Sequence, residues 1–125
     1  MLTDAEIEAA KANIDRLGRG HYEHNDCIRM AYEWLSAQNT VKVAKKQHLE
    51  LKHIIEKWAG RYVSQDDVEV AAAALHPRVT GKYPNFNLSA RLVMPNDRRL
   101  QGIGEALSQD YRERLDPTVY AVVEA

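Results

Sequence analysis

Cysteine and long apolar runs are nearly absent from this sequence. Cys27 is its only cysteine, so no disulfide can form within the chain. No stretch approaches the ~20 consecutive apolar residues that a membrane-spanning helix needs. The acidic start of the sequence also lacks the basic segment and apolar run of a secretory signal. We therefore expect a protein of the reducing cytoplasm that has no membrane partner.

Motifs of catalysis and cofactor binding are missing as well. There is no Gly-x-Ser-x-Gly turn, and no pair of carboxylates is arranged in a way that suggests acid–base work. The segment Gly18-Arg19-Gly20 is too short for a phosphate-binding loop and follows a helical pattern instead of a strand. We expect no cofactor, and the sequence favours a non-enzymatic function over catalysis.

Four side chains that can bind transition metals lie close together at His21, His24, Asp26 and Cys27. A structural zinc site usually takes paired ligands from two segments, and no second Cys/His pair completes this one. We favour the interpretation that this is the entry of a helix, with polar histidines near the cap, a buried thiol and no metal.

Helical periodicity dominates the rest of the sequence. The chain has 125 residues, of which 45% are hydrophobic, enough for one core. The fold we predict is mainly α, with four to five helices around one core, in a single domain over residues 1–125. The predicted helices span residues 3–17, 26–38, 44–59 and 64–75.

Capping residues support these helix boundaries. Thr3 with Glu6 forms a capping-box pattern, Ser64 is a typical N-cap, and Gly60 is a typical helix stop. Asn25 or Asp26 is the expected N-cap of the second helix, and Gly18 and Gly20 are expected to end the first. The apolar repeats predict these buried residues: Trp34, Leu35, Leu51, Ile54, Ile55, Trp58, Val68, Ala72 and Leu75.

The chain after residue 75 is less regular. Residues 76–86 contain two prolines and a glycine, which predicts a loop with room for a small β-hairpin or wing after residue 77. Residues 87–94 alternate like a strand but also fit a short helix over 88–94, which we favour. Residues 97–107 suit one more helical turn, and residues 116–125 form either an edge strand or a loose C-terminal tail.

Charge is unevenly distributed although the formal net charge is only −1. Residues 42–62 and residues 76–99 are rich in lysine and arginine, whereas the segments around them are acidic. A chain that is nearly neutral overall can still carry a basic face. These two blocks are the candidate contact surface for a polyanion, although basic residues opposite an apolar stripe are also common on an ordinary solvated face.

The segment 64–99 resembles the second and third helices of a winged helix-turn-helix DNA-binding domain. The resemblance rests on the pattern Leu-Ser-Ala-Arg-Leu over residues 88–92, followed by Asp97-Arg-Arg. It implies that Ser89 and Arg91 face the major groove, while Lys82, Arg98 and Arg99 contact phosphates. We add to the predicted contact set these further bases: Arg78, Lys45, Lys46 and Lys52.

A second helix-turn-helix register would pair the helices over 44–59 and 64–75. Its spacing suits the motif better, but its second helix begins with Asp66, Asp67 and Glu69, which would repel phosphates. We therefore rank this register below the first.

The leading prediction is a DNA-binding, regulatory domain. The alternative is a protein-binding module, such as a small inhibitor or adaptor, that uses the acidic ends and the aromatic loop around Tyr83 and Phe86. We expect those aromatic residues to cover the edge of the core. If the chain forms a homodimer, residues 119–123 are the candidate interface.

Overall fold

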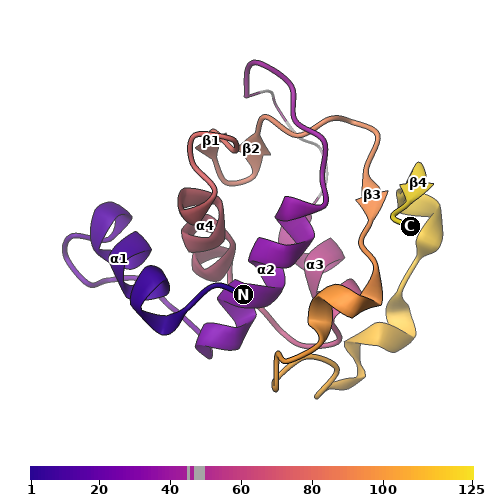
Figure 1. Ribbon diagram of the computed structural model, residues 1–125, viewed down its shortest axis with the longest axis horizontal. Helices are drawn as coiled ribbons and strands as arrows, with labels where there is room; N and C mark the ends of the chain where they lie inside the picture. The colour runs from indigo at the N-terminus through magenta and orange to yellow at the C-terminus, as the bar shows by residue number, and fades with distance from the viewer. Residues whose placement is uncertain (45, 47–49) are drawn as a thin grey trace.

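The computed structural model describes residues 1–44, 46 and 50–125, and this part of the chain contains four α-helices and only small pairs of strands. The mainly α prediction is confirmed (Figure 1). The helices are α1 (Asp4–Ile14), α2 (Asn25–Ser36), α3 (Leu51–Ala59) and α4 (Gln65–Ala74). The strands are β1 (Gly81–Lys82), β2 (Asn85–Phe86), β3 (Val93–Met94) and β4 (Val122–Val123). Three 3-10 turns complete the description: η1 (Asp97–Leu100), η2 (Asp110–Arg114) and η3 (Pro117–Val119).

Three of the predicted caps are confirmed. Thr3 and Glu6 form the capping box of α1, Ser64 caps α4, and Gly60 ends α3 in the left-handed conformation with φ 69°. The prediction for α2 was wrong, because its N-cap is His24. The His24 imidazole Nδ1 accepts a hydrogen bond of 2.9 Å from the backbone N–H of Asp26.

The first helix is shorter than its apolar stripe predicted. α1 ends at Ile14, so the stripe buries Ile7 but leaves Ile14 47% and Leu17 73% exposed. The Asp15 carboxylate accepts backbone N–H bonds from the chain that follows, at Arg19 and Gly20. These bonds favour a turn over continuation of the helix.

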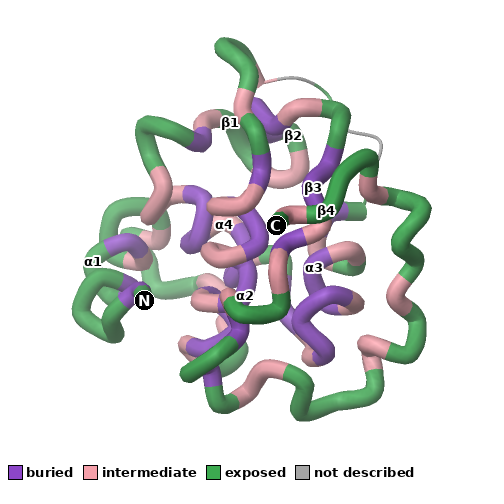
Figure 2. The backbone as a smooth tube through the Cα atoms, turned by 45° about the vertical axis from the view of Figure 1, so that its right-hand side comes forward, coloured by how far each residue is buried: buried purple, intermediate pink, exposed green. Residues whose placement is uncertain are grey.

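The core lies where α2 packs against α3 and α4, and buried residues line all three helices (Figure 2). Trp34 and Trp58 are both completely buried at its centre. All of the predicted core residues are buried except Ile54 and Leu75, which are half-buried. Helical periodicity therefore identified the part of the core that the helices contribute, but not the buried residues outside them, such as Val79, Leu88 and Ile103.

The predicted short helix over residues 88–94 was wrong. This segment is extended and pairs with other parts of the chain. Thr40 and Leu88 form an antiparallel bridge, and Val93 belongs to β3. The side chain of Gln38, which is 1% exposed, accepts from the Val93 N–H at 2.9 Å and donates to the Val93 carbonyl at 2.8 Å. The backbone groups of this segment therefore find partners outside it, as buried backbone groups must.

Two small pairs of strands flank the helices. β1 and β2 form an antiparallel hairpin with Lys82 opposite Asn85, which confirms the small hairpin predicted after residue 77. β3 pairs with β4 in parallel. The Tyr120 hydroxyl accepts a hydrogen bond of 3.0 Å from the Trp34 indole, so residues 116–125 are held against α2 by specific contacts. Among the described residues, no helix is long and apolar enough to cross a membrane.

Candidate nucleic-acid interface

The two basic segments of the sequence meet in space. Residues 39–41, after α2, run antiparallel to residues 87–89. The Val41 N–H donates to the Asn87 carbonyl at 2.8 Å, and the Ser89 N–H donates to the Asn39 carbonyl at 2.8 Å. Residues separated by almost fifty positions are thereby fixed side by side.

The side chain of Asn87 ties a third loop to this pair. Its Oδ1 accepts from the Thr80 N–H at 2.8 Å, and its Nδ2 donates to the carbonyls of Val41 and Arg78 at 3.0 Å each. Asn87 is only 4% exposed. A buried amide whose hydrogen bonds are all made to backbone groups fixes the geometry of the loops around it.

The hairpin is also in close contact with the loop after α2. Gly81 has φ 100°, and a Cβ added there would lie 2.3 Å from the Asn85 carbonyl oxygen and 2.8 Å from the Ala44 Cβ. In addition, the Arg78 guanidinium donates to the Gln38 carbonyl. Glycine at position 81 is what allows the hairpin to approach the loop after α2 this closely.

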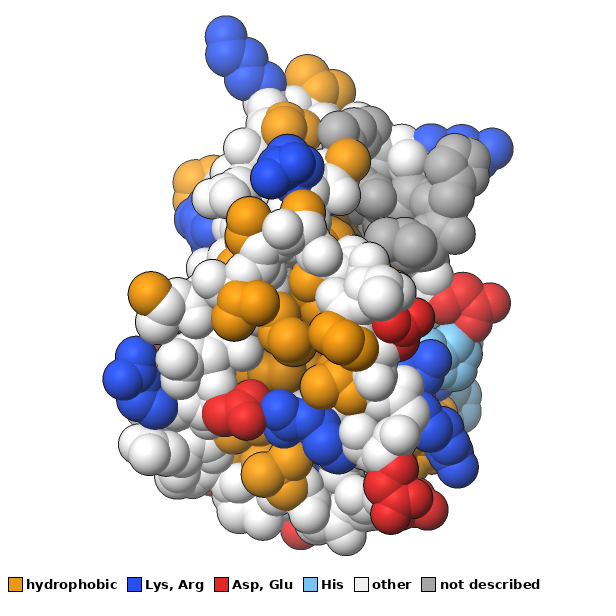
Figure 3. Space-filling view, turned by 90° about the vertical axis from the view of Figure 1, so that its right-hand side faces the viewer, with side chains coloured by type: hydrophobic (Ala, Val, Ile, Leu, Met, Phe, Trp, Pro, Cys, Tyr) orange, Lys and Arg blue, Asp and Glu red, His pale blue; other side chains and the backbone are white. Residues whose placement is uncertain are grey.

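These joined loops carry five described bases and no acid. We call this surface the basic cap; it consists of Lys42, Lys46, Arg78, Lys82 and Arg91. No aspartate or glutamate occurs in residues 37–49 or 76–96. Figure 3 shows lysine and arginine side chains, and no acidic ones, at the upper end of the molecule, whereas acidic side chains lie lower on this face.

The basic cap is exposed, and its charges are not neutralised locally. All five side chains belong to exposed residues. Within residues 1–44, 46 and 50–125, none of the five forms an ion pair with a carboxylate. A cluster of unpaired cations on tethered loops is a surface to which a polyanion is attracted.

Three of the predicted contact residues have other positions or partners. The Lys52 ammonium lies 3.0 Å from the Glu56 carboxylate, and Arg99 bonds Glu33 and Glu124. Arg98 is exposed but lies on η1, beyond β3 and away from the basic cap (Figure 1).

Arg91, which belongs to the cap, and the neighbouring Ser89 lie on non-helical chain instead of the helix that the winged helix-turn-helix resemblance implies. The Ser89 hydroxyl accepts from the Arg91 N–H at 3.2 Å, which closes a local turn. Lys45 lies outside the described residues. The resemblance therefore provides no recognition helix, and the basic cap replaces it as the candidate interface.

Three residues of the histidine–cysteine cluster, His24, Asp26 and Cys27, make contacts within the fold. His24 caps α2, Asp26 pairs with Arg29 at 2.8 Å, and the Cys27 thiol is buried near the Tyr62 carbonyl. Burial raises the pKa of Cys27 to about 12. In the described part of the chain, no group of three or more His, Cys, Asp or Glu residues is placed to hold a metal ion.

The aromatic loop covers the core edge, as expected. Phe86 is 2% exposed, and Tyr83 is half-buried, with its ring at 77° to that of Phe86 and the ring centroids 6.3 Å apart. Little of this aromatic surface is accessible to a protein partner. This observation weakens the alternative prediction of a protein-binding module that uses the aromatic loop.

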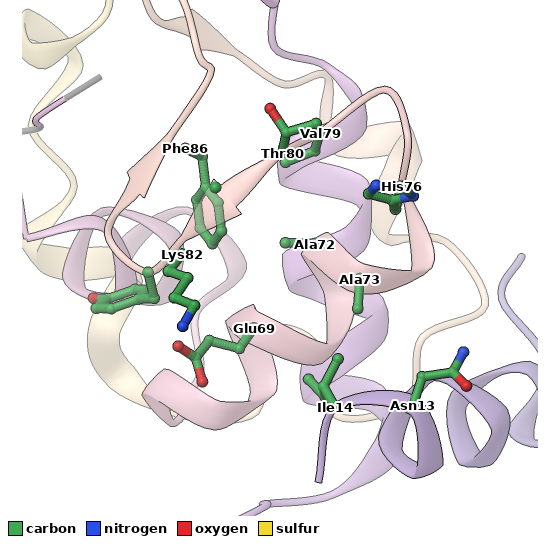
Figure 4. Close-up of a pocket in the computed structure, with 12 residues that line it drawn as sticks. Asn13, Ile14, Glu69, Ala72, Ala73, His76, Val79, Thr80, Lys82 and Phe86 are labelled. Carbon is green, nitrogen blue, oxygen red and sulfur yellow. The ribbon is translucent and has the colours of Figure 1, made fainter. Parts of the chain in front are cut away.

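Beside the hairpin lies a groove of about 730 Å³ that sequence patterns did not reveal. The end of α1, the outer face of α4 and residues 76–86 form its walls (Figure 4). The only signal for it in the sequence is the run of small residues 71–74, because alanine side chains on α4 leave space that larger ones would fill. Its opposing charges, Glu69 and Lys82, come from segments that only the fold brings together.

No family model, curated protein or solved structure matches this chain.

Proposed function

We propose that this chain is a non-enzymatic nucleic-acid-binding protein with a regulatory role on DNA, and that the basic cap is its contact surface. The observation that carries the proposal is the meeting of two distant basic loops at one end of the molecule, within residues 37–49 and 76–96, which contain no carboxylate side chain. Because loops form the cap, its contacts are with phosphates, which position a duplex without reading its sequence.

The test is a fluorescence-anisotropy titration of a labelled DNA duplex at several salt concentrations. A variant combining Lys42→Ala, Lys46→Ala and Arg91→Ala removes three exposed charges from the cap. If each contacts one phosphate, the slope of log affinity against log salt becomes shallower by about 3, since each contact contributes about −0.9.

A matched control removes three charges elsewhere, through Arg16→Ala, Arg19→Ala and Lys57→Ala. Both variants have the same net charge, so a general electrostatic effect weakens them equally. The proposal requires that the cap variant lose affinity and that the control keep it. Absence of binding by the wild type at low salt, or equal losses in the two variants, contradicts the proposal.

A second candidate function is self-association through the C-terminal segment. Val122 is 42% and Val123 71% exposed on β4, and hydrophobic side chains gather at the middle of the face that carries this segment (Figure 3). Exposed apolar clusters mark interaction sites. Light scattering after size exclusion measures the mass directly: a dimer that Val123→Asp converts to a monomer supports this function, and a monomer at all concentrations refutes it.

A further inference from the structure

The groove beside the hairpin has the size and lining of a small-molecule site. Its volume of about 730 Å³ lies within the ~300–1,000 Å³ range of ligand pockets. Ala72 and Ala73 of α4 form one apolar wall, and Val79 and Phe86 form the other. Figure 4 shows these side chains around one open space.

Two opposite charges face this space from different elements. Glu69 is on α4 and Lys82 is on β1 (Figure 4). Figure 4 shows their charged ends directed toward one another, and they interact electrostatically, but they do not form an ion pair. The Glu69 carboxylate is half-buried, and no described residue donates a hydrogen bond to it.

The neighbouring carboxylates are already engaged. Asp15 accepts from the N–H groups of Arg19 and Gly20, and Asp66 accepts from the His21 N–H at 2.7 Å. Burial, together with the nearby Asp66, raises the pKa of Glu69. A half-buried carboxylate without a donor is stabilised by a cation brought to it.

We propose that the groove binds a small zwitterion of the amino-acid type that has an apolar side chain. The ligand's ammonium group contacts Glu69, its carboxylate contacts Lys82, and its side chain lies between α4 and the hairpin. A zwitterion fits because it carries one charge opposite to Glu69 and one opposite to Lys82, whereas a simple amine or acid leaves one of the two side chains unmatched. This site does not depend on the nucleic-acid proposal, although Lys82 belongs to both surfaces.

Three probes that share an indole ring separate the contributions of the two charges. L-Tryptophan carries both charged groups, tryptamine lacks the carboxylate, and indole-3-propionate lacks the ammonium group. In a titration followed by amide ¹H–¹⁵N chemical shifts, we expect saturable shifts centred on Glu69, Ala73 and Lys82. Each truncated probe binds about tenfold more weakly than L-tryptophan, equivalent to about 1.4 kcal/mol.

Variants assign the effect to the groove. Glu69→Gln removes the preference for L-tryptophan over indole-3-propionate, and Lys82→Gln removes the preference over tryptamine. Ala73→Met fills the groove and abolishes binding, whereas Ala9→Met, on the exposed face of α1, leaves it unchanged. The amide spectra of the free variants report whether each is folded.

Three results overturn the proposal: no saturable shift with L-tryptophan, equal affinity for all three probes, or shifts centred away from the groove. The titration contains no nucleic acid, and the DNA test leaves Glu69 and Lys82 intact. Failure of one proposal is therefore distinguishable from failure of the other.

Discussion

Replacing Gln38 by methionine tests whether residues 88–94 are held as extended chain. The Gln38 amide pairs with both the N–H and the carbonyl of Val93, at 2.9 and 2.8 Å, and Val93 is only 7% exposed. Methionine has a similar length but cannot replace these bonds. Each buried backbone group left unpaired costs about 1–3 kcal/mol. We therefore expect the free energy of unfolding to fall by about 2–5 kcal/mol.

Urea unfolding followed by tryptophan fluorescence measures this loss, because Trp34 and Trp58 are both buried in the folded state. Gln101→Met is the matched control, since Gln101 is exposed in a turn and its side chain makes no hydrogen bond within the described residues. If residues 88–94 formed the predicted helix, the Val93 groups would be paired inside it. A loss below about 0.5 kcal/mol for Gln38→Met would refute the extended arrangement.

Three further predictions concern single residues. Gly60→Ala places a side chain on a residue with φ 69° and puts its Cβ 2.9 Å from the Leu107 Cα, so it should lower the free energy of unfolding by about 1–3 kcal/mol in urea unfolding. The control Gly104→Ala should be nearly neutral, because its Cβ would lie no closer than 3.6 Å to any other atom. Because Cys27 is buried and has a pKa of about 12, Ellman's reagent at pH 8 should modify it only as fast as the protein unfolds, and rapid modification of the folded protein would contradict this. Hydrogen bonds from Arg99 lower the pKa of Glu124 from 4.5 to about 2, so the folded state binds this proton less readily than the unfolded one. The stability that this ion pair contributes is complete above about pH 4.5 and is lost as the pH falls toward 2. Because the pair is partly exposed, we expect a contribution on the order of 1–2 kcal/mol. Urea unfolding at pH 6 and pH 3 should show a smaller pH dependence for Arg99→Ala than for the wild type.

The Arg99 contacts also change an expectation about DNA binding. The resemblance to winged helix-turn-helix domains implied a phosphate contact at Arg99. In the structure Arg99 joins α2 to the C-terminal segment through Glu33 and Glu124. Loss of DNA affinity in an Arg99 variant would therefore be confounded by instability, which is why the cap variant leaves Arg99 in place.

Local sequence signals determined the helices and the core. Helix capping by Thr3 and Ser64 depends on interactions within a few residues, and the burial of Trp34 and Trp58 follows the period of one helical face. Both features can therefore be predicted from the sequence. The same signals failed at residues 88–94, where the hydrogen-bond partners of the backbone lie at positions 38–39 and 121–124.

Only the tertiary structure decided which charges act together. The sequence shows two basic blocks, and the pairing of residues 39–41 with 87–89 brings their loops together in the basic cap. Lys52 and Arg99 do not belong to this surface, because they form ion pairs with carboxylates. The groove likewise exists because α4 and the hairpin meet across small side chains. Spacing along the chain carries no information on such long-range pairing, which depends on the backbone hydrogen bonds and buried side chains of the folded protein.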